Sequence, residues 1–329
     1  MKRKAYFDAV LASLKTFNDP SNTIDFRDSS NISYLTRELE GIRKKVFERR
    51  YRPIRYRELI PLSVGGGLGV DSLITEVRDK VGKAAFINAG TDIPQVSITR
   101  TEGATPVRVI GAMWETTIFE IAKAQLAGTS LNSRKATACG EVMQTELNDV
   151  AWFGSPDNGL KGFLEGPADY VVSGATANDR LWVNKTPREI LNDINEVFIR
   201  INEESDDAYE ADTLLLPVAQ YNYIDTTPVS DNNDMSIKNW IISNSSFLNG
   251  PESIQRLSEL REAFGTVANP VNGMVAYAKN EEYVTMHIPQ DVMTLPPHQQ
   301  HLSFQNIMLA STGGVEWVVP ESARIVTGI

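Results

Sequence analysis

Residues 115–154 read ETTIFEIAKAQLAGTSLNSRKATACGEVMQTELNDVAWFG, and this stretch predicts two helices in tandem around which the rest of the chain is arranged. Thr116 or Thr117 can cap the first helix, because a threonine hydroxyl accepts a hydrogen bond from a free backbone amide of the first turn. Gly128 can end it, since glycine readily adopts the left-handed conformation of a helix C-cap. The apolar positions of this helix are Ile118, Phe119, Ile121, Ala122 and Leu126.

The second helix is the longest periodic segment of the sequence. Asn132 or Ser133 can cap it, and Gly154 stops it. Small and apolar residues recur every three or four positions, at Ala136, Cys139, Met143, Leu147, Val150 and Ala151. We expect this stripe to pack on a sheet and the opposite face to be wet. The residues expected on the wet face are Glu141, Gln144, Glu146, Asn148 and Asp149.

The composition is that of a soluble globular protein. The chain has 329 residues, of which 42% are hydrophobic and 22% charged, and this length suits two modest lobes. No apolar run approaches the roughly 20 residues that cross a bilayer. Residues 1–15 carry Asp8 inside a short apolar run and offer no cleavage site, so we expect no signal peptide and a cytoplasmic location. The single cysteine, Cys139, is interpreted as a small core residue rather than a nucleophile.

The net charge of −10 is unevenly distributed along the chain. Residues 1–57 contain fourteen Lys or Arg and seven Asp or Glu, whereas the remainder contains eighteen and thirty-five. The basic end therefore suits an acidic partner, either nucleic acid or the acidic body of a second copy. A solvated basic surface without a partner is the alternative.

The first sixty residues predict an arm rather than a packed domain. Amphipathic helices fit residues 4–17 and 34–46, but turn-forming residues separate them, and residues 48–58 alternate apolar or aromatic side chains with arginines. Residues 65–69 read GGGLG, a glycine-rich sequence that could indicate a nucleotide-binding loop. Val70 stands where the third glycine of a dinucleotide loop should be, and no strand run leads into the turn, so we expect a flexible hinge.

Residues 75–111 predict a long β-hairpin with little to bury. Val77 and Val81 lead out and Val96, Ile98, Val107 and Val109 lead back, alternating with polar residues. An isolated two-stranded ribbon is marginal in water, so the hairpin should lie on another surface. If no second lobe covers it, that surface belongs to another subunit.

A compact second lobe follows. Residues 186–189 read TPRE, a capping box with proline at the first helical position, and apolar spacing continues this helix to Ile201. Residues 213–219 predict a buried strand, and residues 236–247 and 251–264 predict two more helices. Later residues predict strands at 274–278, 283–288, 302–309 and 314–319, and a last short run to 329.

Residue types that carry chemistry do not assemble into a site. His298 and His301 have a spacing that suits a shared metal on a helix, but neighbouring prolines and the lack of a third ligand oppose it. His287 alternates into a strand, and the acidic run at 203–212 lacks the pattern of a calcium loop, so a solvated loop is favoured. No hydrolase or metalloprotease motif is present. We therefore expect no catalytic residue, no cofactor site, no metal site and no enzyme.

The order of the parts resembles the major capsid, or coat, proteins of tailed bacteriophages, which have the Hong Kong-type coat fold. The resemblance covers residues 54–329 and begins with the basic arm, the glycine hinge, the long hairpin and the tandem helix. Further motifs that carry it are Phe153-Gly154, Gly159-Leu160-Lys161-Gly162, Leu214-Leu215-Leu216-Pro217, Met274-Val275-Ala276-Tyr277, Ile288-Pro289-Gln290, Leu295-Pro296-Pro297-His298-Gln299, Gly313-Gly314-Val315 and Pro320. These motifs are structural and contain no active site.

The resemblance implies an α+β fold in five parts. These are an N-terminal arm (1–60), a glycine hinge with an extended β-hairpin loop (61–114), a peripheral domain with a long spine helix (115–165), an axial domain (166–290), and C-terminal strands that return to the peripheral domain (291–329). The hairpin would lie over a neighbouring subunit. Some relatives join subunits by a Lys–Asn isopeptide bond, for which the candidates here are Lys80, Lys83 and Asn88, although such residues are common on any loop.

The implied function is structural. The chain would self-assemble into pentamers and hexamers of an icosahedral phage head around double-stranded DNA. Expected partners are other copies, then scaffolding, portal or decoration proteins, and packaged DNA through weak non-specific contact, with no membrane. The expected location is the virion, after assembly in the host cytoplasm. The alternatives are an encapsulin-like bacterial nanocompartment shell and an α/β enzyme that binds a nucleotide.

Overall fold

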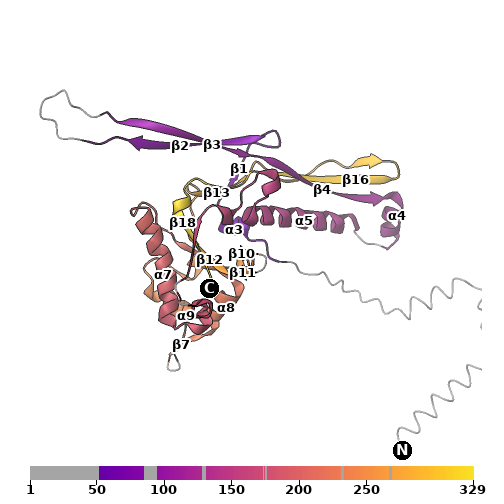
Figure 1. Cartoon of the computed structure of the whole chain (residues 1–329). Coiled ribbons are helices and arrows are strands. Elements are labelled where there is room, and N and C mark those ends of the chain that lie inside the picture. The colour runs from indigo at the N-terminus through magenta and orange to yellow at the C-terminus, as the bar shows by residue number, and fades with distance from the viewer. Residues whose placement is uncertain are drawn as a thin grey trace, which may run out of the picture. The chain divides into compact units, whose positions relative to one another are not determined.

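The computed structural model describes residues 52–84, 95–127, 131–172, 174, 176–230, 233–266 and 269–329. The predicted arm helices, Gly128 and Asn88 lie outside these residues. The described chain mixes helices with many strands, which confirms the α+β class (Figure 1). None of the helices in the described residues combines the length and the apolar character that a bilayer crossing requires.

The capping signals predict the starts of α4 and α7, but not that of α5, which begins at Leu131, ahead of the predicted caps Asn132 and Ser133. The described α-helices are α3 (Tyr56–Leu59), α4 (Ile118–Ala127), α5 (Leu131–Phe153), α6 (Ala177–Arg180), α7 (Pro187–Glu204), α8 (Val218–Thr226) and α9 (Ile237–Asn244). Thr117 caps α4, because its hydroxyl accepts the Glu120 amide at 3.2 Å and its own amide donates to the Glu120 carboxylate at 3.1 Å. Thr186 and Glu189 form the predicted capping box of α7.

The strands form one five-stranded sheet, one four-stranded sheet and several smaller ones among the described residues. The first nine are β1 (Leu62–Val64), β2 (Ser72–Val81), β3 (Ser97–Pro106), β4 (Arg108–Thr117), β5 (Ala168–Val171), β6 (Thr213–Pro217), β7 (Pro228–Ser230), β8 (Asn233–Ser236) and β9 (Ile254–Leu257). The others are β10 (Phe264–Thr266), β11 (Asn269–Val271), β12 (Gly273–Tyr277), β13 (Val284–Ile288), β14 (Gln290–Thr294), β15 (His298–Gln300), β16 (Ser303–Thr312), β17 (Gly314–Trp317) and β18 (Ala323–Thr327).

The five-stranded sheet has the order β5-β18-β12-β6-β9, and its strands β6 and β12 are buried on both faces. Leu215 and Tyr277 belong to the α5 core, which also holds buried residues of α3, α5, β13 and β17. Leu214 and Ala276, their neighbours along the strands, belong to the α7 core, which holds the apolar faces of α7, α8 and α9. Because successive side chains of a strand point to opposite faces, one sheet serves both cores.

Helix α5 lies along strands β4 and β16 (Figure 1). The predicted stripe is confirmed from Cys139 onward, since Cys139, Met143, Leu147, Val150 and Ala151 are all buried, whereas Ala136 is half-buried. The expected wet face is wrong at Asn148, which is only 2% exposed. Its amide hydrogen-bonds buried partners and so avoids the cost of burying an unpaired polar group.

Two glycines turn the chain back at the end of α5. Gly154 has φ +69°, and a Cβ at Gly162 would lie 2.3 Å from the Gly154 nitrogen. Only glycine allows this backbone contact. The turn sends Phe163 into the α5 core, where its ring lies 5.3 Å from Trp152 and 5.1 Å from Tyr277.

The predicted helix at residues 251–264 is wrong. The segment forms a 3₁₀ turn, then β9, which pairs in parallel with β6, then a second 3₁₀ turn and β10. Ile254 lies in the α7 core and Leu257 in the α5 core. A spacing of three puts two residues on one face of a helix but on opposite faces of a strand, and a sheet buried on both faces accepts both.

Three further expectations concern strands, and the structure corrects two of them. Residues 108–117, expected partly in the hairpin, form β4 and pair with β16 along ten positions. The last strand, β18, is expected to return to the peripheral domain; it pairs with β12 and β5 in the five-stranded sheet and places Ala323 and Ile325 in the α5 core, so this expectation stays a prediction. A short strand, β1, does lead into the glycine turn, and at three residues it is too short for a periodic signal.

Truncating the buried stripe should destabilise the fold much more than truncating the wet face of the same helix. Leu147 is 0% exposed, so Leu147→Ala should lower the free energy of unfolding by about 2–5 kcal/mol. The adjacent exposed residue provides the control, since Glu146→Ala should change it by about 0.5 kcal/mol or less. Urea denaturation of unassembled protein measures both values, and equal stability of the two variants would contradict the assignment of the faces.

Candidate assembly surfaces

The three histidines do not form a shared site. His298 is exposed on strand β15, not on a helix, and His301 is exposed in the turn that follows, with φ +55°. His287 lies on β13 and hydrogen-bonds Glu316 at 2.8 Å. Among the residues that the structure describes, no group of three or more His, Cys, Asp or Glu side chains is placed to hold a metal ion.

The glycine turn (65–69) and the acidic run (203–212) have structural roles: the first is a turn between strands, and the second contributes an ion pair. Gly65, Gly66 and Gly67 have positive φ angles, and the turn leads from β1 to β2 rather than into a helix N terminus that could hold phosphate. In the acidic run, Glu204 pairs with Arg324. Neither segment therefore gathers groups around a ligand.

Cys139 is 8% exposed on α5. Burial raises the pKa of its thiol, which disfavours the reactive thiolate. Its position agrees with a packing role.

The β2–β3 hairpin carries little of the core. Its strands pair with each other over ten positions, from Ser72 opposite Pro106 to Val81 opposite Ser97. Most of its side chains are exposed, including Ile74 at 70% and Ile98 at 64%. Such an exposed apolar ribbon buries its side chains only against a further surface.

The two faces of the hairpin differ in charge. Register places Glu76 opposite Glu102 and Arg78 opposite Arg100 on one face. Like charges directly opposite one another are unfavourable, and Glu76 offsets this by accepting from Arg78 at 2.9 Å and Arg100 at 2.8 Å. On the other face, Val77 and Val81 are exposed opposite threonine and serine. Ile74 and Ile98 lie on the charged face, so each face of the hairpin carries exposed apolar side chains that suit packing.

A second exposed apolar surface lies on the sheet of β14, β16 and β4. Alternate residues of β4, Ile110 and Ala112, pack into the α5 core, so Val109 and Met113 point away from it. Met113 is 56% exposed and pairs across the ladder with Ile307. Helix α4 extends the exposed apolar area, with Phe119 at 65% and Leu126 at 91%.

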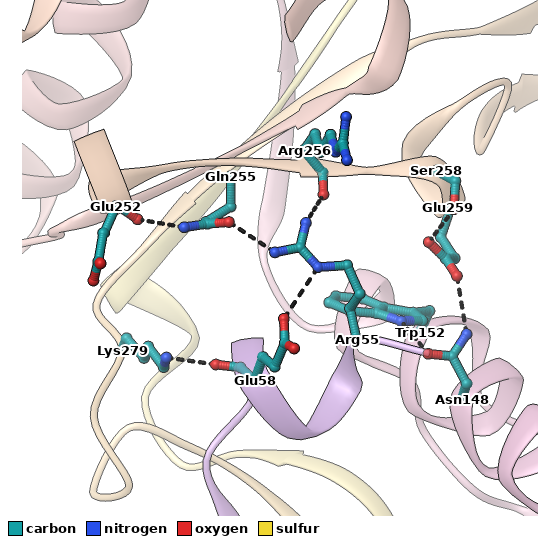
Figure 2. Close-up of polar contacts among 10 residues, drawn as sticks. All are labelled: Arg55, Glu58, Asn148, Trp152, Glu252, Gln255, Arg256, Ser258, Glu259 and Lys279. Carbon is teal, nitrogen blue, oxygen red and sulfur yellow. Dashed lines mark hydrogen bonds and ion pairs between the residues drawn. The ribbon is translucent and has the colours of Figure 1, made fainter. Parts of the chain in front are cut away.

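The lead-in segment, residues 52–60, is fixed by a polar network (Figure 2). The Arg55 guanidinium donates to Glu58 at 3.2 Å, to the Gln255 side chain at 2.8 Å and to the Arg256 carbonyl. Lys279 donates to the Glu58 carbonyl. The segment therefore joins α3 to strand β9 and to the turn after β12.

A second, buried polar network ties α5 to the turn after β9 (Figure 2). Asn148 donates to the Glu259 carboxylate at 2.9 Å and accepts from the Trp152 indole at 3.2 Å. Ser258 donates to the second Glu259 oxygen at 2.8 Å, and Arg52 lies 3.4 Å from the first. Glu259, 3% exposed, is thus compensated on both oxygens.

The family follows from comparison with known proteins. A family model described as "Major capsid protein" matches residues 82–329, which is most of the chain. The chain belongs to the major capsid protein family. No curated protein sequence matches this capsid protein.

Solved capsid structures share the fold. The capsid of Myoviridae phage XM1 is 17% identical with a TM-score of 0.75, and the match covers 89% of this chain and 98% of the other. The capsid of a native GTA particle is 10% identical with a TM-score of 0.58, covering 87% and 93%. A structure from Mycobacterium phage Bobi is 12% identical with a TM-score of 0.55, covering 88% and 97%. These likenesses confirm the predicted coat fold.

The family gives this capsid protein a structural role in the virion, within a shell of its own copies. Neither the nanocompartment nor the nucleotide-binding enzyme is favoured by the match. Of the cross-link candidates, Lys80 and Lys83 are exposed near the end of β2, and Asn88 lies outside the described residues. The network around Glu259 was missed from sequence. The sequence signal that could have revealed it is a polar residue next to the apolar stripe of a helix, as Asn148 is to Leu147 and Ala151.

Removing the buried amide of α5 should weaken this capsid protein's fold. Asn148→Ala takes a donor from the buried Glu259 carboxylate and an acceptor from Trp152, and should lower the free energy of unfolding by about 1–3 kcal/mol. Thr145→Ala, one turn earlier and exposed, should stay within about 0.5 kcal/mol of the parent chain. Urea denaturation provides the comparison. An Asn148→Ala variant as stable as Thr145→Ala would show that the network contributes nothing.

Proposed function

We propose that this chain forms pentamers and hexamers of an icosahedral phage head that encloses double-stranded DNA. The observation that carries the proposal is the β2–β3 hairpin, whose strands are paired over ten positions but almost entirely exposed. In a family of capsid proteins, such a limb is explained by a neighbouring copy that covers it. Head-to-tail contacts of this kind close into rings.

The energetic reason is apolar burial on assembly. Ile74, Val77, Val81 and Ile98 are each 42–70% exposed on the hairpin. Burying a Val or Ile side chain fully contributes about 1.5–3 kcal/mol, so covering several in every subunit favours the shell over the separate chain. The exposed apolar face around Met113, and the α4 residues Phe119 and Leu126, supply further surface for contacts between copies.

The five-part division is proposed with the sheet pairings taken into account. The peripheral domain takes α5 with β4, β14, β15 and β16, and also β1, β13 and β17. The axial domain takes α7, α8 and α9 with the five-stranded sheet, including β18. Residues 1–60 form the arm, and its lead-in segment, residues 52–60, makes the polar contacts of Figure 2.

The charge distribution supports a container for DNA. The chain beyond residue 57 has an excess of acidic residues, so it would not hold packaged DNA tightly by counterion release. The basic first 57 residues are left for contacts between subunits or for weak phosphate contacts. Scaffolding, portal and decoration proteins are the further proposed partners, and the role is structural rather than enzymatic. Assembly is proposed to occur in the host cytoplasm.

Shortening the hairpin should abolish shells without unfolding the chain. Residues 76–102 are replaced by Asn-Gly, a sequence that closes a two-residue hairpin and keeps the pair formed by Thr75 and Gly103. We expect a soluble protein with the parent circular dichroism spectrum and no particles by negative-stain microscopy. Particles of full size from this variant would remove the hairpin from the assembly.

Placing a charge on the exposed sheet face should block assembly in a similar way. Met113 is 56% exposed, so Met113→Asp should leave the thermal unfolding midpoint of the unassembled chain within a few degrees. An unpaired carboxylate is costly to bury, so shell yield should fall sharply. Met113→Leu, the apolar control of similar volume, should assemble. Normal shells from Met113→Asp would show that this face stays in solvent.

A further inference from the structure

A side-chain hydrogen bond to one carboxylate ties the root of the hairpin to the body. Within the residues that the structure describes, Thr75 is the member of β2 and β3 whose side chain bonds to another sheet, donating to Glu316 Oε2 at 2.8 Å. Glu316 lies on β17, between buried Val315 and half-buried Trp317. The same Oε2 atom lies 2.8 Å from His287 Nε2 on β13.

The body side of this contact is held firmly. Strands β13 and β17 pair side by side, and Val284, Met286, Ile288 and Val315 are all at most 1% exposed. Glu316 is itself only 16% exposed, and the hydrogen bond from His287, with Lys161 nearby, holds the pKa of its carboxyl below the usual range. The carboxylate thus stays ionised at neutral pH and presents a fixed acceptor to Thr75.

The hairpin side is loosely packed. A cleft of about 380 Å³ lies beside the root, lined by residues 103–106 of β3 on the hairpin and by Lys161, Gly162, Gly166 and Trp317 on the body. Gly103, which pairs with Thr75 across the ladder, has no side chain to fill it. This side of the root is therefore not filled by apolar side chains, and the hydrogen bond from Thr75 to Glu316 lies beside the cleft.

We propose that Glu316 is a positioning residue, which fixes the direction of the β2–β3 hairpin relative to the body by holding Thr75 while His287 orients the carboxylate. The consequence for assembly rests on the proposed function, because a hairpin that must reach a neighbouring copy has to leave its own subunit at a set angle. The contact itself is a property of the single chain and is testable without shells.

The direct test measures hairpin direction in unassembled protein. Cys139, the single cysteine, is replaced by serine, and spin labels are attached at Ser97→Cys on β3 and Glu146→Cys on α5, both exposed positions. Pulsed electron resonance should give a narrow distance distribution in this background. Adding Glu316→Gln or Thr75→Val should broaden it, whereas Glu321→Gln, an exposed carboxylate nearby in sequence, should not.

Hydrogen exchange provides a second readout. Amides of residues 72–75 and 103–105 should exchange roughly tenfold faster in Glu316→Gln and Thr75→Val than in the parent chain, because a charge-assisted hydrogen bond is lost. Amides of α7 should be unchanged, which excludes global unfolding as the cause. Unchanged distance distributions and unchanged root exchange in both variants would overturn the positioning role, whether or not the parent chain forms shells.

Discussion

Burial of strands β6 and β12 of the five-stranded sheet on both faces is the constraint on which the rest of the structure depends. Leu214 and Leu216 are committed to the α7 core and Leu215 to the α5 core, so a shift of strand β6 by one residue would exchange the two sets. The same alternation in β12 places Met274 and Ala276 on one side and Val275 and Tyr277 on the other. The two cores therefore fold as neighbours of one sheet rather than as separable lobes.

Away from the two cores, several segments of the described chain keep apolar side chains exposed. The β2–β3 ribbon, the outer face of β4 and β16, and helix α4 all keep apolar side chains exposed. In a protein that functions alone, such surfaces would be a liability for aggregation. In a capsid protein such surfaces are available for contacts between copies, because neighbouring copies can cover one another's apolar side chains.

Much of the fold could be predicted where local signals agree with tertiary contacts. The capping box before α7, the Gly154 stop of α5 and the run of leucines in β6 each specify an element whatever surrounds it. The prediction of a helix at residues 251–264 was wrong because apolar spacing near three is shared by a helix and by a strand buried on both faces. The prediction that Asn148 is exposed was wrong because its buried partner, Glu259, lies far away in sequence. The hairpin and its approximate length were predicted from its thin apolar face, but the point where the returning strand ends was not, since the pairing of β4 with β16 is a non-local contact.

The most direct measurement is sedimentation velocity of the purified full-length chain over a wide range of concentration, with electron microscopy of the fractions. The account predicts a transition from single subunits or capsomers to closed particles of defined size, in which density for the hairpin lies on an adjacent copy. A chain that stays monomeric at every concentration, with Ile74 and Ile98 covered by its own body, would contradict it.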